Sequence, residues 1–125
     1  MTDMFNDVKE FQVAFELNVG KSPNLPFAPE RKLRVMLLRE EFEEYIKAEN
    51  EDDIVEIADA LADLIYIACG TAVSYGIPLD KVFEEVHRSN MAKLVDGKVL
   101  RREDGKILKP EGWTPPDIKK ILNPQ

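Results

Sequence analysis

Two groups of acidic residues are the part of this sequence whose types and spacing could do chemistry. They are the carboxylates of two successive segments, REEFEEY and VEIADALAD: Glu40, Glu41, Glu44, Glu56, Asp59 and Asp63. At about 100° per residue, the members of each group share one arc of a helix. The first arc continues the apolar stripe of Leu33 and Leu37, and the second also carries Ala60. Both groups are therefore expected to face inward.

Buried carboxylates need partners, because an unpaired buried charge costs more free energy than a small domain has to spare. Few basic residues could face these acids; Arg34, Arg88 and Lys93 are the candidates. A hard divalent cation such as Mg²⁺ or Mn²⁺ takes oxygen ligands and can join carboxylates to phosphates. A solvated acidic face is the alternative interpretation of EEFEE alone. The acids of the second segment interrupt an otherwise apolar helix and favour a metal site.

Asn90 and Lys93 could supply the second half of a binding site. They extend the apolar stripe of PLDKVFEEVHRSNMAKL, where an amide could bind a sugar or base and an ammonium group a phosphate. The alternative is an ordinary helix end with a lysine near its C-terminus. The single histidine, His87, cannot supply the two Glu-x-x-His pairs of a di-iron bundle. No glycine-rich phosphate loop, paired cysteines or nucleophile elbow is present.

Four helices are expected to position these residues, over about 3–18, 30–48, 53–75 and 78–94. The first has Met4, Val8, Phe11 and Phe15 on one face, and a proline-rich connector, GKSPNLPFAP, follows it. The third helix is apolar on almost all sides, which is typical of a helix in the middle of a bundle. The fourth helix is expected to turn Leu79, Val82, Phe83 and Val86 toward the core.

The last thirty residues differ from the rest. Asp-Gly-Lys occurs twice, at Asp96 and Asp104, and predicts a short β-hairpin or a looped excursion. A proline-rich arm that contains Trp113 follows. The sequence therefore predicts one all-α domain over 1–125: a four-helix bundle with its helical core at about 3–94, and a C-terminal hairpin and extended arm at about 95–125.

Composition restricts the class of protein. The chain has 125 residues and a formal net charge of −7, which argues against a nucleic-acid binder. Its one cysteine, Cys69, lies in an apolar run and cannot form an internal disulfide, which is expected of a protein in a reducing compartment. The first residues lack the features of a signal peptide, and no apolar run reaches the length of a membrane span. A soluble, cytoplasmic protein is expected.

The two acid motifs resemble a known family. Glu40-Glu41-Phe42-Glu43-Glu44 followed by Glu56-Ile57-Ala58-Asp59 is similar to the EExxE…ExxD signature of the all-α nucleoside triphosphate pyrophosphohydrolases. The longer text, EIADALADLIY…GTAVSYGIPLDKVFEEVHRSNMAKL with REDGKILKP and PPD, resembles the MazG-like branch often labelled phosphoribosyl-ATP pyrophosphohydrolase-like. The similarity covers about residues 11–117.

This resemblance implies a reaction and a role for each residue. Glu41, Glu44, Glu56 and Asp59 would be metal ligands, and Glu40 would orient or deprotonate the attacking water. Asn90 and Lys93 would hold the nucleotide and its phosphates, with Asp63 as a further acid of less defined role on the substrate side. The reaction would be Mg²⁺-dependent hydrolysis, with Mn²⁺ as a possible substitute, of a nucleoside triphosphate to the monophosphate and pyrophosphate.

The resemblance also implies a homodimer or larger homo-oligomer, with nucleotide-pool housecleaning, on dUTP, dCTP or non-standard nucleotides, as the role. Two alternatives stay open. One is hydrolysis of phosphoribosyl-ATP. The other is a helical metal-binding or interaction module without turnover.

Overall fold

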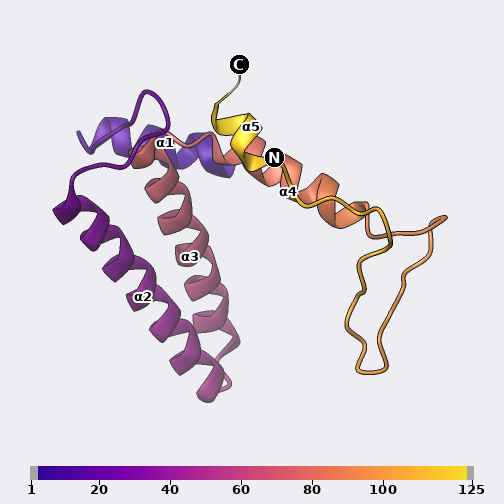
Figure 1. Ribbon diagram of the computed structural model, residues 1–125. Coiled ribbons are helices and arrows are strands. Elements are labelled where there is room, and N and C mark those ends of the chain that lie inside the picture. Colours follow the sequence, from indigo (N-terminus) through magenta and orange to yellow (C-terminus); the bar gives the residue numbers. More distant parts are fainter. Residues whose placement is uncertain (1–2, 124–125) are drawn as a thin grey trace. The chain divides into compact units, whose positions relative to one another are not determined.

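The computed structural model describes residues 3–123, and these form five helices (Figure 1). The helices are α1 (Met4–Ala14), α2 (Ala28–Asn50), α3 (Ile54–Tyr75), α4 (Leu79–Met91) and the short α5 (Ile118–Leu122). No strand occurs in this part of the chain, so the predicted all-α fold class is confirmed. None of the described helices is both long and apolar enough to cross a membrane.

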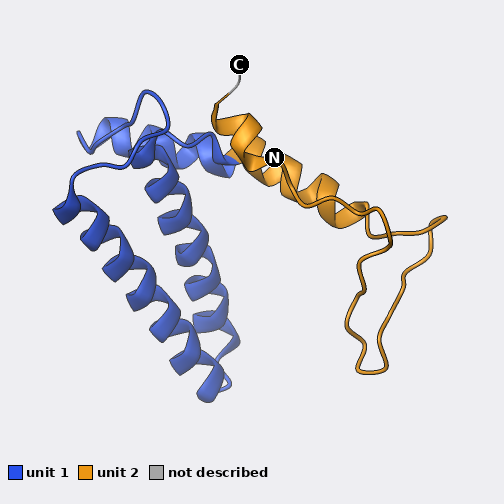
Figure 2. Ribbon diagram, in the orientation of Figure 1, with its two compact units in different colours: residues 1–79 blue, residues 80–125 orange. Residues whose placement is uncertain are grey.

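The chain divides into two compact units (Figure 2), residues 1–79 and residues 80–125. The first unit contains α1, α2 and α3, and the second contains α4 and the C-terminal segment. The boundary between the units falls at the start of α4, ahead of the boundary near residue 94 expected between the helical core and the tail. The single-domain organisation over 1–125 stays a prediction.

Helices α2 and α3 form an antiparallel hairpin (Figure 1). The Asp53 side chain caps α3 by accepting a hydrogen bond from the backbone N–H of Glu56 at 3.2 Å, and Gly76 ends it in the left-handed conformation. These are the predicted boundaries of α3. Helix α2 begins slightly earlier than predicted, at Ala28, because Pro29 lies in the first turn, where proline needs no intrahelical partner.

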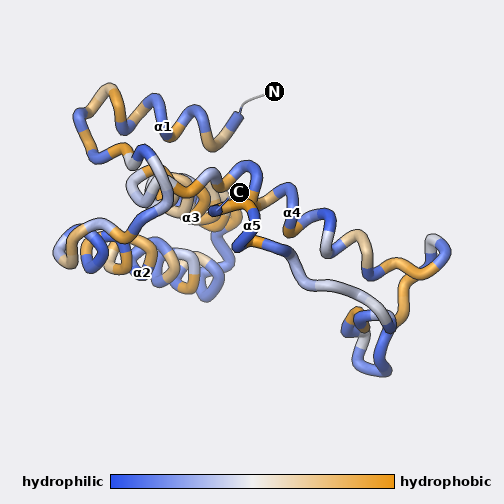
Figure 3. The backbone as a smooth tube through the Cα atoms, turned by 45° about the horizontal axis from the view of Figure 1, so that its top comes forward, coloured by the Kyte–Doolittle hydropathy of each residue, from blue (hydrophilic) through white to orange (hydrophobic). Residues whose placement is uncertain are grey.

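Helix α3 lies between α1 and α2, as its nearly continuous apolar character predicts (Figure 3). On the α1 side, the buried Gln12 amide donates to the Ser74 hydroxyl at 3.1 Å. On the α2 side, the Arg34 guanidinium donates to the Ile67 carbonyl and the Thr71 hydroxyl, both at 3.0 Å. The buried apolar residues are mostly small: Val8, Ala48, Ala60, Cys69, Ala72 and Val73.

Helix α1 is shorter than predicted. It ends at Ala14, and Glu16 just beyond it has a φ of 57°, which a helix does not continue. Of the four apolar residues expected to face the core, only Val8 is buried, and Met4 and Phe15 are exposed. Phe11 stacks on Phe15 with ring centroids 4.4 Å apart, so the two rings bury part of their surface against each other.

In the second unit, the tail forms turns rather than strands. Val95 pairs with Lys98 around the first Asp-Gly, and Arg101 pairs with Ile107 around the second. Of the two predicted forms, a short β-hairpin and a looped excursion, the described part of the tail adopts the looped excursion. The expected inward position of Phe83 on α4 is wrong, since its side chain is 70% exposed. Instead, α4 buries Ser89 beneath the C-terminal segment.

Candidate metal centre and active site

Three carboxylates of the α2–α3 hairpin gather at one point. Glu41 and Glu44 come from adjacent turns of α2, and Asp63 comes from the facing side of α3. One carboxylate oxygen from each lies within 4.8 Å of the others. Glu41 and Asp63 are half-buried, and Glu44 is exposed. Helical spacing of three residues places the first two on the same face of α2.

The raised pKa values and the unpartnered oxygen of this acid cluster indicate a binding site for a cation. Burial, and then the negative charges of Glu44 and Asp63, raise the pKa of Glu41 to about 7. The pKa of Asp63 is also raised, first by burial and then by the charge of Asp59. The Glu41 Oε2 atom is buried and has no hydrogen-bond partner among the described residues. An all-oxygen donor set with an orphaned buried oxygen fits a hard divalent ion.

A pocket continues the site along the same side of the hairpin. Its volume is about 300 Å³. Most of the residues that line it are acidic, and Lys47 is the one basic residue among them. Two small residues, Ala48 and Ala60, also line it. The lining residues are Glu44, Lys47, Ala48, Glu51, Glu56, Asp59 and Ala60. Glu44 belongs to both the pocket and the acid cluster, so the two are contiguous.

The structure divides the four predicted metal ligands between these two features. Glu41 and Glu44 lie in the acid cluster, whereas Glu56 and Asp59 line the pocket. Asp63, expected on the substrate side, is the third member of the cluster. Its signal was already in the sequence, because it lies one turn beyond Asp59 on the acidic arc of α3.

Other predicted site residues lie elsewhere. Glu40 is exposed and belongs neither to the acid cluster nor to the pocket lining. Asn90 and Lys93 lie in the second unit, where Asn90 is exposed and Lys93 is half-buried. The Lys93 ammonium is 5.6 Å from the centre of the Trp113 ring. Sequence analysis had not placed Trp113 beside a predicted site residue.

Comparison with known proteins defines the family. The family model for phosphoribosyl-ATP pyrophosphohydrolase matches residues 8–90, which include both acid motifs and Asn90. The chain therefore belongs to this family. Its structure is that of an all-α protein with a carboxylate cluster on two facing helices. The family is named for pyrophosphohydrolase activity, and its members typically depend on a divalent metal.

A curated relative matches over a similar length. The chain is 36% identical over 92 residues to an uncharacterized protein of Acanthamoeba polyphaga mimivirus. The match covers 64% of this chain and 37% of that protein, so the chain spans well under half of the relative's length.

Proposed function

We propose that the protein hydrolyses a nucleoside or deoxynucleoside triphosphate to the monophosphate and pyrophosphate, with Mg²⁺ as the metal and Mn²⁺ able to replace it. The observation that carries this proposal is the buried, unpartnered Glu41 Oε2 among the carboxylates of Glu44 and Asp63. A binding site for a divalent ion explains why α2 and α3 hold these acids together. Family membership supports the class of reaction.

Each acid then has a defined task. Glu41, Glu44 and Asp63 would hold one divalent ion, and Glu56 and Asp59 would supply further ligands from the pocket wall. Bound divalent ions would neutralise phosphate oxygens and activate water for attack. Glu40, exposed and outside the cluster, is free to orient or deprotonate that water. Asn90 and Lys93 would contact the nucleotide and its phosphates.

The proposal includes a second copy of the chain. The hairpin exposes large apolar side chains on both helices: Val35, Phe42 and Ile46 on α2, and Ile54, Leu61 and Ile65 on α3. All six side chains are at least 42% exposed, and the same spacing recurs on both helices.

Large exposed apolar side chains gathered on one pair of helices are typical of an interaction surface. The few small buried residues also give the first unit little core of its own. A second copy of the hairpin packed on these side chains would bury them, which matches the oligomer expected from the family resemblance. Sedimentation of the wild type and of Phe42→Glu tests this: a dimer that the substitution dissociates supports it, and a monomeric wild type contradicts it.

The proposed substrates are dUTP, dCTP or non-standard nucleotides in the cytoplasm, as in nucleotide-pool housecleaning. Hydrolysis of phosphoribosyl-ATP is the second candidate, favoured by the description of the matching family. Turnover of phosphoribosyl-ATP far above that of any nucleoside triphosphate would establish it instead.

Glu40→Gln separates catalysis from metal binding. We expect this variant to keep its Mn²⁺ affinity and to lose pyrophosphate release by about 100-fold or more, since general-base catalysis contributes roughly 10²–10⁴-fold. Glu43→Gln, an exposed neighbour on the same helix, is the matched control and should keep both properties. Metal binding without turnover in the wild type would leave only the non-catalytic module.

A further inference from the structure

Two ammonium groups lie against the single tryptophan of the chain. The Lys93 Nζ is 5.6 Å from the centre of the Trp113 ring, and the Lys109 Nζ is 4.9 Å from it. Both distances are within the range of a cation–π interaction. Lys93 lies two residues beyond the end of α4 and Lys109 lies in the C-terminal segment, so the two positive charges at the ring come from separate parts of the chain.

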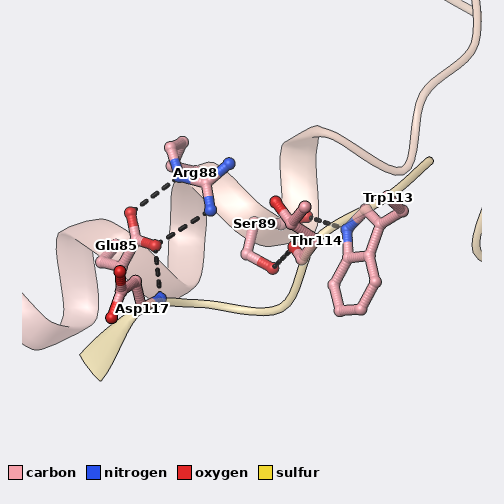
Figure 4. A network of polar contacts seen from close by, with 6 residues as sticks. All are labelled: Glu85, Arg88, Ser89, Trp113, Thr114 and Asp117. Atoms are coloured by element: carbon pink, nitrogen blue, oxygen red, sulfur yellow. Dashed lines mark hydrogen bonds and ion pairs between the residues drawn. The ribbon is translucent and has the colours of Figure 1, made fainter. Parts of the chain in front are cut away.

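The ring that gathers these lysines is firmly held on α4 (Figure 4). The Trp113 indole N–H donates to the Ser89 carbonyl at 2.7 Å, and the Ser89 hydroxyl donates to the Thr114 carbonyl at 3.3 Å. Ser89 is 1% exposed, so these contacts are shielded from water. One turn earlier, Glu85 accepts a hydrogen bond from the backbone N–H of Asp117 at 2.7 Å. These hydrogen bonds fix the position of the indole ring relative to α4.

The two lysines lack a countercharge. Within residues 3–123 neither ammonium group forms an ion pair with a carboxylate, although acidic residues outnumber basic ones, 24 to 17. Two positive charges beside one ring repel each other, and an anion that contacts both would offset this repulsion. A chain of phosphates carries negative oxygens along its length, so one such ligand could contact an ammonium group with each end.

We propose that Lys93, Lys109 and Trp113 form a polyphosphate-binding site, in which the C-terminal segment supplies a second phosphate-binding lysine. Lys109 and Trp113 lie beyond residue 90, where the match to the family ends. The assignment of this site to the substrate rests on the proposed function, in which Lys93 binds the phosphates of the nucleotide. Both the triphosphate of the substrate and the released pyrophosphate share the required chemistry.

Trp113 itself reports on the site, because it is the only tryptophan. The full-length protein, in excess chelator so that no metal contributes, is titrated with inorganic triphosphate, pyrophosphate and a non-hydrolysable nucleoside triphosphate. Binding is followed by tryptophan fluorescence and, independently, by calorimetry. The variants are Lys109→Ala, Lys109→Arg and the control Lys106→Ala, an exposed lysine of the same segment.

We expect Lys109→Ala to weaken binding of all three ligands by about tenfold, as for loss of one contact to a charged group. Lys109→Arg should restore most of the affinity, and Lys106→Ala should match the wild type. Equal affinities for Lys109→Ala and Lys106→Ala would overturn the site, and a loss confined to the inorganic ligands would overturn its assignment to the substrate. An enzyme with no turnover but an intact Lys109-dependent titration would instead contradict the proposed function alone.

Discussion

A carboxylate oxygen of Glu41 lies within 4.8 Å of one from Asp63, although the two residues belong to different helices. Two small residues, Ala48 on α2 and Ala60 on α3, are buried nearby and line the adjoining pocket, so no bulky side chain from these positions separates the helices. Without a cation, such a pair is favourable only while one of its members is protonated. The hairpin therefore holds its acids in a geometry that costs stability unless positive charge is supplied.

The metal-free protein should lose stability as the pH rises. The pKa of Glu41 is about 7, above its ordinary value of 4.5. A carboxyl group whose pKa is raised on folding stabilises the fold fully below the unfolded pKa, and this contribution is lost as the pH rises through 7. Thermal unfolding in chelator between pH 4.5 and 8 should show the decline.

Glu41→Gln removes this charge and should raise the metal-free melting temperature at pH 8 by on the order of a few degrees. The same substitution should abolish most of the stabilisation that Mg²⁺ gives the wild type. Glu43→Gln should change neither quantity. A wild type whose melting temperature is insensitive to both pH and Mg²⁺ would refute the interpretation of this cluster.

Asp63 should behave as a metal ligand rather than as a substrate contact. Its oxygen lies in the cluster with Glu41 and Glu44, so Asp63→Asn should weaken Mn²⁺ binding by about tenfold or more. Calorimetric titration with Mn²⁺ in the absence of nucleotide measures this directly. Unchanged Mn²⁺ affinity, with only the KM for nucleotide raised, would return Asp63 to the substrate side.

Gly70→Ala should destabilise the first unit by about 1–3 kcal/mol. A Cβ at this position would lie 2.5 Å from the Arg34 Nη2 and 2.7 Å from the Gln12 Oε1. Arg34 cannot easily move aside, because its guanidinium is bound to Ile67 and Thr71 on α3.

Urea unfolding of Gly70→Ala, with exposed Ala68→Ser as the control on the same helix, tests the prediction. In an Arg34→Ala background the cost of Gly70→Ala should shrink, since one of the two close contacts is gone. An equal cost in both backgrounds would show that Arg34 does not carry the effect.

Acid should release the C-terminal segment from α4. The pKa of Glu85 is lowered to about 2, first by its hydrogen bond to Arg88 and then by the backbone N–H of Asp117. A carboxyl group with a lowered pKa contributes stability above its unfolded value of 4.5, and this is lost as the pH falls through 2.

Trp113 fluorescence should therefore change between about pH 4.5 and 2 in the wild type. In Glu85→Gln the change should already be present at neutral pH, whereas Glu84→Gln, an exposed neighbour, should resemble the wild type. Release that is identical in all three proteins would exclude Glu85 as the fastening residue.

Much of the helical architecture was predictable because its signals are local. Helix α3 begins after the side-chain cap of Asp53 and ends at the left-handed Gly76, and both signals depend only on neighbouring residues. The end of α1 was not predictable in this way. Its apolar spacing continues through Phe15, but that ring stacks on Phe11 at the surface after the helix has ended.

The acidic arcs were predictable from periodicity, and their division was not. Which acids meet depends on the register between α2 and α3, which no local pattern in the sequence specifies. The register in the structure brings Asp63 to Glu41 and Glu44, whereas Glu56 and Asp59 line the pocket. The position of Lys93 and Lys109 beside Trp113 could not be predicted from the sequence, because it depends on long-range hydrogen bonds from the tail to Ser89 and Glu85.

Pyrophosphate release from a panel of nucleoside triphosphates, with Mg²⁺, with Mn²⁺ and with chelator, tests the central claim most directly. The account predicts release that requires the divalent ion, favours one base, and falls by about 100-fold or more in Glu41→Gln but not in Glu43→Gln. Release that persists in chelator, or a Glu41→Gln variant as active as the wild type, would contradict a metal-dependent site at this cluster.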